Sequence, residues 1–351
     1  MRRSHRTVLV AALLVVALVG VGAAPVAASD GECAFPLTET DDTGTDVTLE
    51  EPAETVVVLD AASAQTLWEI GAEETVIGMP VRSYTEYLEG SEQREDVLTE
   101  DGMGVDVETV VELDADLVIA PNYVADDTIE QLREADQTVY RTGFEESFEA
   151  IYEKTELYGH FVGECEAAGT VADETREEVE EIRSAVDGED APRVLYYFFG
   201  VSPGAETFQH DLIEVAGGEN VAATAGISFY EEISDELILE QDPEWIVTTD
   251  DPDAFDPEEE PFPETTAVQS EQTLVVDANL ASQAAPRVVE PLREMAEAFH
   301  PEAFEETETP TETETPTPEP ETETPEPDDQ PGFGVVVAIV TAVAAALVYR
   351  R

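Results

Sequence analysis

Cysteine and histidine, which often supply nucleophiles and transition-metal ligands, are scarce in this chain of 351 residues. The chain has two cysteines, Cys33 and Cys165, and its three histidines outside the N-terminal segment, His160, His210 and His300, lie far apart. Metal sites and nucleophilic sites need such side chains in groups. The sequence also has no Gly-x-Ser-x-Gly elbow and no glycine-rich phosphate-binding loop. We therefore expect no catalytic residues, no metal site and no cofactor.

Carboxylates are the abundant reactive groups, with 82 Asp and Glu residues against 15 Lys and Arg and a formal net charge of -67. This balance excludes nucleic acid as a partner, because nothing could neutralise the phosphates. It also makes carboxylate pairs too common to indicate glycosidase chemistry. Lys154 is the only lysine. Together with a hydrophobic fraction of 42%, these features indicate a folded protein of a halophilic archaeon, in which concentrated salt screens self-repulsion. A merely acidic protein is the alternative, which would not explain the near-absence of lysine.

The first half of the chain alternates short apolar runs with helical patterns. Such alternation predicts an α/β lobe with a mainly parallel sheet, here over residues 29–145. The predicted strands cover residues 56–59, 75–78, 116–120 and 138–140, and the predicted helices cover 61–71, 107–113 and 126–135.

A similar order returns after Pro192, which predicts a second α/β lobe over residues 191–304. Its predicted strands cover residues 194–199, 245–249 and 273–277, and its predicted helices cover 211–216, 237–241 and 288–299. Between the lobes, residues 146–190 contain two amphipathic helical patterns, at 147–162 and 166–187. We expect the second of these helices to join the lobes.

The N-terminal 28 residues have the pattern of a secretory signal peptide. Three arginines precede an apolar run from Val8 to Val21, and small residues follow at Ala24–Ala28. The Arg2-Arg3 pair leaves both the general and the twin-arginine export routes open. Cys33 follows Asp30, Gly31 and Glu32 rather than apolar residues, so we do not expect it to carry a lipid.

Export also bears on the two cysteines. Outside the cytoplasm thiols become oxidised, so we expect a disulfide between Cys33 and Cys165. It would tie the N-terminal segment to the start of the connecting helix. Two free buried thiols are the alternative.

The C-terminal end has a spacer and an apolar segment. Residues 305–330 are almost entirely Glu, Thr, Pro and Asp, a composition that cannot bury a core. Residues 331–351 contain Pro331-Gly332-Phe333, an apolar run from Val335 to Val348, and Arg350-Arg351. A short transmembrane helix is one interpretation. The order also resembles the archaeal PGF-type sorting signal, which implies cleavage by an archaeosortase and attachment to a membrane lipid. The protein would then be held at the cell surface, on the outer face of the cytoplasmic membrane.

Residues 52–304 resemble the helical-backbone class of ABC transporter substrate-binding proteins, which serves vitamin B12, ferric siderophores and haem. The order and spacing of several segments carry this resemblance: Thr55–Gly78, Gly104–Ala120, His210–Val221, Ile233–Val247 and the closing Ala285-Pro286-Arg287. It implies two Rossmann-like lobes joined by a long helix, the class III periplasmic-binding-protein fold. It also implies a monomer that closes only modestly on its ligand, with an ABC permease and its ATPase as partners.

The resemblance assigns roles to five residues. Glu108 and Glu236 match the glutamates, one on each lobe, that pair with arginines of the permease in cobalamin-binding members. Tyr84, Phe199 and Tyr230 match positions around the cleft, where aromatic rings suit a large flat corrinoid. The alternatives are solvated surface for the glutamates and core packing for the rings.

Two positions depart from the cobalamin-binding pattern. Gln283 stands where those proteins carry an arginine, and Asp101 stands near the position of a tryptophan. The expected ligand is a corrinoid, with a ferric siderophore or haem as the alternative. An anchored structural protein of the cell surface is an alternative of a different class, although the chain has no tandem repeats.

Overall fold

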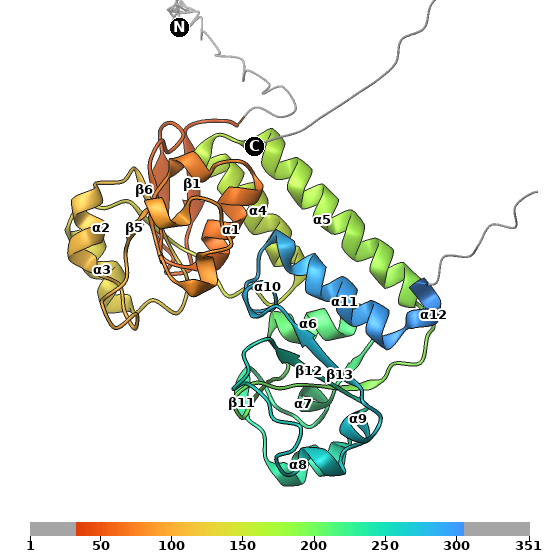
Figure 1. Cartoon of the computed structure of the whole chain (residues 1–351). Helices are drawn as coiled ribbons and strands as arrows, with labels where there is room; N and C mark the ends of the chain where they lie inside the picture. The colour runs from red at the N-terminus through yellow and green to blue at the C-terminus, as the bar shows by residue number, and fades with distance from the viewer. Residues whose placement is uncertain (1–32, 305–351) are drawn as a thin grey trace, which may run out of the picture. The chain divides into compact units, whose positions relative to one another are not determined.

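The computed structural model describes residues 33–304 (Figure 1). The predicted signal peptide, the acidic spacer and the sorting signal lie outside these residues. Within residues 33–304, none of the helices is both long and apolar enough to cross a membrane.

The N-terminal lobe is built on a five-stranded sheet with the order β5-β4-β3-β6-β7, in which every neighbouring pair is parallel. Its central strands consist of fully buried apolar residues, as expected for parallel strands covered on both faces. The strands are β3 (Val56–Val58), β4 (Val76–Met79), β5 (Glu95–Asp96), β6 (Leu117–Ala120) and β7 (Val139–Arg141). The helices are α1 (Ala61–Glu69), α2 (Val107–Leu113) and α3 (Asp126–Glu134).

The C-terminal lobe repeats this plan with a four-stranded parallel sheet of order β10-β8-β12-β13. These strands are β8 (Arg193–Tyr196), β10 (Glu219–Asn220), β12 (Trp245–Thr249) and β13 (Thr273–Val276). The helices are α6 (Phe208–Val215), α7 (Val221–Thr224), α8 (Asp235–Gln241), α9 (Thr266–Gln269), α10 (Ala278–Ala281), α11 (Val289–Phe299) and α12 (Pro301–Phe304). The expected α/β fold with parallel sheets in two lobes is confirmed.

Two antiparallel pairs were not expected. β1 (Leu37–Thr40) pairs with β2 (Asp46–Leu49), and β9 (Val201–Pro203) pairs with β11 (Tyr230–Glu232). All three residues of β11 are exposed, so no apolar alternation marked this strand in the sequence. The strand expected over residues 194–199 ends at Tyr196, and the chain turns through positive φ angles at Phe199 and Gly200 before β9.

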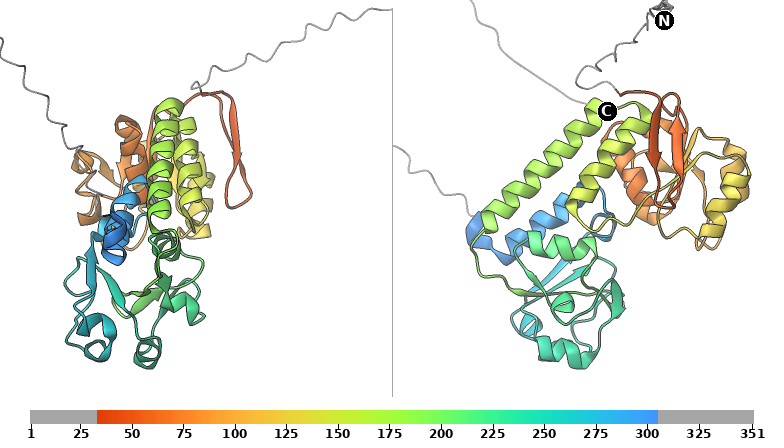
Figure 2. Two further views of the ribbon diagram at one scale, coloured as in Figure 1. Left: turned by 90° about the vertical axis from the view of Figure 1, so that its right-hand side faces the viewer. Right: turned by 180° about the vertical axis from the view of Figure 1, so that it is seen from behind.

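Two helices, α4 (Phe148–Val162) and α5 (Cys165–Val186), pack side by side and connect the lobes (Figure 2). Each contributes to both hydrophobic cores. Tyr158 of α4 and Ala168 of α5 are buried in the N-terminal core, whereas Ile151 of α4 and Ile182 of α5 are buried in the C-terminal core. A shift of one lobe against the other would therefore disturb packing in both cores.

A disulfide joins Cys33 to Cys165, the first residue of α5, as expected from the sequence. The half-cystines are 132 positions apart, so the cross-link encloses the whole sheet of the N-terminal lobe. It attaches the beginning of the described chain to the helices that connect the lobes.

Candidate ligand-binding cleft

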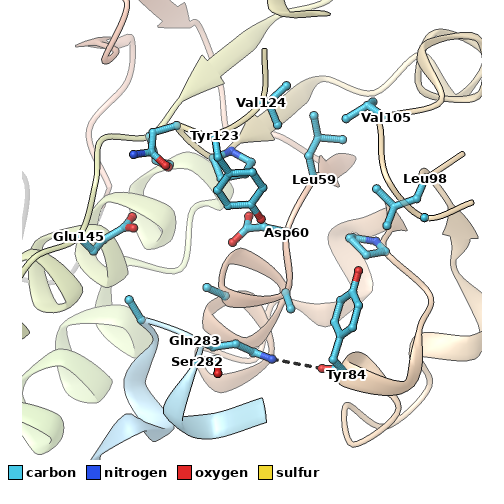
Figure 3. Close-up of a pocket in the computed structure, with 18 of the residues that line it drawn as sticks. Leu59, Asp60, Tyr84, Leu98, Val105, Tyr123, Val124, Glu145, Ser282 and Gln283 are labelled. Atoms are coloured by element: carbon cyan, nitrogen blue, oxygen red, sulfur yellow. Dashed lines mark hydrogen bonds between the residues drawn. The ribbon is translucent and has the colours of Figure 1, made fainter. Parts of the chain in front are cut away.

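A cavity of about 770 Å³ lies between the two lobes (Figure 3). Much of its N-terminal wall follows the carboxyl ends of parallel strands: Asp60 comes shortly after β3, Pro80 follows β4 and Pro121 follows β6. The C-terminal lobe supplies residues of α10 and the segment after it, together with Tyr230 of β11. Open α/β sheets bind ligands at this edge, because the loops that follow the strands converge there.

Aromatic rings from both lobes project into the cavity. Tyr84, Tyr123 and Phe144 come from the N-terminal side and Tyr230 from the C-terminal lobe, and all four are partly exposed, by 39%, 74%, 39% and 40%. Large rings left accessible in a concave site provide contact area for a ligand. Tyr84 and Tyr230 were among the residues expected from the sequence, whereas Tyr123 and Phe144 were not.

Phe199, the third expected ring, is not among the residues that line this cavity. It lies 58% exposed at the turn between β8 and β9, with a φ of 49°. The sequence placed it at the end of a strand, where it would face the cleft edge. Strand β8 ends three residues earlier, at Tyr196, so Phe199 lies in the turn that follows and its ring does not line the cavity.

Hydrogen bonds fix the two expected tyrosines. The Tyr230 hydroxyl donates to Oε1 of Gln209 at 2.6 Å, and burial raises the pKa of Tyr230 to about 12. The carbonyl oxygen of Tyr84 accepts a hydrogen bond from Nε2 of Gln283 at 3.2 Å, and burial raises the pKa of Tyr84. Both hydroxyls therefore remain protonated at neutral pH, so neither adds negative charge to the cleft.

Gln283 is also the centre of a polar network between the lobes. Its Oε1 accepts hydrogen bonds from the Tyr87 hydroxyl at 2.6 Å and from Nε2 of Gln65 at 3.2 Å. Oε1 of Gln65 in turn accepts the backbone N–H of Arg287 at 3.0 Å. Gln65 is fully buried, and Gln283 is 6% exposed. The departure from the cobalamin-binding pattern at position 283 thus lies in the cavity wall, where an uncharged side chain joins the lobes.

The only lysine of the chain lies buried behind this wall. Nζ of Lys154, on α4, donates to the carbonyl oxygen of Ala284 at 2.5 Å and lies 3.3 Å from Oε1 of Glu145. Both Glu145 and Ala284 line the cavity. The ammonium group is thus neutralised by Glu145 and does not itself face the cleft.

The two glutamates expected to contact a permease occupy equivalent positions in the lobes. Glu108 and Glu236 are the second residues of α2 and α8, which have seven residues each. Each helix is followed by the strand that pairs with the first strand of its lobe's parallel sheet: β6 pairs with β3, and β12 pairs with β8. Both glutamates are exposed. Asp114 and Asp242 end the two helices in the left-handed conformation, so the repeat extends to local geometry.

Two α/β lobes joined by two packed helices, with a cleft of ligand size between them, have the arrangement of a solute-binding protein. Residues 56–280 match the model of the family described as "Periplasmic binding protein", and the chain belongs to this family.

Three individual proteins are similar to this chain over most of its length. A protein of Halobacterium salinarum named "Cobalamin-binding protein" is 41% identical over 336 residues, which cover 92% of this chain and 90% of that protein. The crystal structure of the heme-binding protein HmuT has a TM-score of 0.64 at 24% identity, and the match covers 76% of this chain and 91% of that one. The periplasmic vitamin B12-binding protein BtuF of Vibrio cholerae has a TM-score of 0.62 at 18% identity and covers 72% of this chain and 99% of its own.

Proposed function

We propose that this protein is the extracytoplasmic substrate-binding component of an ABC importer, and that it captures a corrinoid and delivers it to the permease. The observation that carries this proposal is the cavity of about 770 Å³ between the lobes, with aromatic rings supplied from both sides. This volume lies toward the upper end of the range of about 300–1,000 Å³ typical of small-molecule sites. A large, flat, partly apolar ligand fits such a space, and the similarity to the cobalamin-binding protein of Halobacterium salinarum supports the same choice.

The ligand is tested by calorimetric and fluorescence titration of the purified protein in multimolar KCl with cyanocobalamin, cobinamide, haem and ferric siderophores. We expect saturable binding of the corrinoids. Binding of haem or of an iron chelate alone would retain the importer and exclude cobalamin. Absence of binding by any of them, in protein shown to be folded, would contradict the proposal.

Single substitutions then locate the site. Tyr84→Ala and Tyr230→Ala are expected to weaken corrinoid binding at least about tenfold, since each ring supplies apolar contact area in the cavity wall. Phe199→Ala serves as the comparison, because Phe199 is an exposed ring outside the cavity. Equal losses in all three variants would support the ligand-contact role that the family resemblance gives Phe199.

We further propose that Glu108 and Glu236 dock the loaded protein onto permease arginines. Their equivalent, exposed positions would let the permease contact both lobes simultaneously, and pairing with arginine is directional. Glu108→Arg and Glu236→Arg are expected to abolish corrinoid uptake by cells while leaving the affinity for the free ligand unchanged. Glu174→Arg, a charge reversal at an exposed position of α5, is the matched control. Normal uptake by both docking variants would exclude this role.

The proposed location is the outer face of the cytoplasmic membrane, reached by export and held through the C-terminus. It is supported by the sequence patterns at the two ends of the chain and by the periplasmic family. Replacing Pro331-Gly332-Phe333 by three alanines is expected to leave the apolar C-terminal segment uncleaved, which mass spectrometry of the membrane-bound protein would detect. If the wild-type protein and the variant end at the same C-terminal residue, processing by an archaeosortase would be contradicted.

A further inference from the structure

Asp60 carries a carboxylate oxygen for which residues 33–304 provide no hydrogen-bond donor. Its Oδ2 caps α1 by accepting the backbone N–H of Ser63 at 3.1 Å, whereas its Oδ1 is buried and has no partner. The side chain is 9% exposed and belongs to the cavity wall. A buried carboxylate oxygen without a donor raises the free energy of the folded protein, so a ligand group that donates to it on binding removes this penalty.

The charges around the cavity leave Asp60 uncompensated. None of the described residues that line it is Lys, Arg or His. The other lining carboxylate, Glu145, is paired with Lys154, as described above. The wall therefore presents one unmatched negative charge together with neutral polar groups.

Tyr123 lies next to this carboxylate. Figure 3 shows its hydroxyl end directed toward Asp60. The ring is 74% exposed, and desolvation in the cleft and the Asp60 charge raise the pKa of Tyr123. A ring so exposed has few contacts to lose, so a ligand can turn it aside and reach the carboxylate.

We propose that Asp60 discriminates between ligands by the polar groups at the edge of the ligand. Its carboxylate accepts a hydrogen bond from an N–H donor of the ligand, which is a primary amide or an amine. The same carboxylate repels a ligand carboxylate. This inference rests on the proposed function and specifies its ligand class. A corrinoid whose side chains end in primary amides meets the requirement. A hydrolysed corrinoid acid, or a porphyrin with two free propionates, does not meet it at this position.

The test compares cyanocobalamin with its separated monocarboxylic acid derivatives, in each of which one side-chain amide is hydrolysed. For the wild-type protein we expect at least one acid to bind about tenfold or more weaker than the amide, because like charges meet at a desolvated position. In Asp60→Asn this ratio is expected to fall to near one. Asparagine caps helices as well as aspartate does, so α1 is retained. Asp60→Ser provides a second neutral capping residue.

Asp106→Asn is the matched control, because Asp106 caps α2 in the same way, by accepting the backbone N–H of Thr109, and does not line the cavity. It is expected to keep the wild-type ratio. Equal binding of every acid and the amide by the wild type, or an unchanged ratio in both Asp60 variants, would overturn the inference while corrinoid binding stood. If no corrinoid binds, the corrinoid assignment of the proposed function fails, and the same comparison is made with haem and its dimethyl ester. Preference for the ester that disappears in Asp60→Asn would support Asp60 as the selective residue, and equal binding by the wild type would overturn it.

Discussion

Replacing Lys154 by methionine removes the only lysine of the chain while keeping an unbranched apolar side chain that is one atom shorter. The ammonium group bonds the carbonyl oxygen of Ala284 at 2.5 Å and lies 3.3 Å from Glu145. The lysine side chain is 7% exposed and that of Glu145 is 21% exposed. Lys154→Met leaves the Ala284 carbonyl oxygen without its donor and Glu145 without its opposite charge. It also tests how the cleft wall is attached to α4.

The expected loss of stability follows from these two contacts. A buried carbonyl oxygen that loses its donor costs about 1–3 kcal/mol. Breaking a fully buried ion pair costs about 3–5 kcal/mol, and the partial exposure of Glu145 places this pair below that range. The substitution also removes the cost of burying an ammonium group. We therefore expect the free energy of unfolding to fall by about 3 kcal/mol, which lowers Tm by about 6–10 °C for a folded unit of this size.

Thermal and urea unfolding in multimolar KCl measure this change. Arg183→Met is the matched control, because Arg183 pairs with Glu180 on α5 where the side chains are 48% and 59% exposed. Such exposed pairs contribute about 0–1 kcal/mol, and concentrated salt screens them further.

A double-mutant cycle with Glu145→Gln isolates the ion pair from the carbonyl contact. The cost of Lys154→Met is expected to shrink by about 1–2 kcal/mol when Glu145 is already neutral. If Lys154→Met changes stability no more than the Arg183 control does, the lysine is not the internal support that its contacts indicate.

Three further predictions concern stability. Replacing Cys33 and Cys165 together by serine is expected to lower the free energy of unfolding by about 2–4 kcal/mol, since the cross-link restricts a long loop of the unfolded chain; unfolding with and without reductant checks this, and equal stability would refute it. Burial raises the pKa of Tyr230 to about 12 from the ordinary value of 10.0 for tyrosine, so the stability from its protonated form is complete below pH 10 and is lost as the pH rises through about 12. Unfolding measured between pH 9 and 12 should show this decline, and Tyr230→Phe should make it shallower; identical pH profiles would exclude the contribution. Gly204→Ala should destabilise the C-terminal lobe by about 2 kcal/mol or more, because a Cβ there would lie 2.1 Å from the Ile227 carbonyl oxygen. A loss of 1 kcal/mol lowers Tm by about 2–4 °C. A Tm within about 1 °C of the wild-type value would therefore contradict this prediction.

Most elements of the two sheets could be predicted from the sequence, because their signal is local. Continuous apolar runs such as Val56–Val58 and Leu117–Ala120 are typical of parallel strands covered on both faces. The spacing of apolar residues along residues 166–187 predicted the long connecting helix, since a helix with one buried stripe repeats about every 3.6 residues. The cysteine pairing followed from an expectation about compartment.

The cleft could be predicted only in part. The family resemblance led to Tyr84 and Tyr230, which line the cavity, and to Phe199, which does not. The difference arises at the turn after β8, where a positive φ redirects Phe199. No periodicity reports such a turn, because it depends on how β9 pairs with β11.

Sequence alone thus determined the class of fold, the two-lobed order and the acidic surface, since these depend on composition and on patterns within about twenty residues. The tertiary structure decided which polar groups meet. Gln65 and Gln283 are 218 positions apart and share a hydrogen bond in the cavity wall. Lys154 reaches Ala284 across 130 positions. Whether Asp60 keeps a free oxygen depends on which donors of the folded chain come near it, and this is fixed only when both lobes pack against α4 and α5.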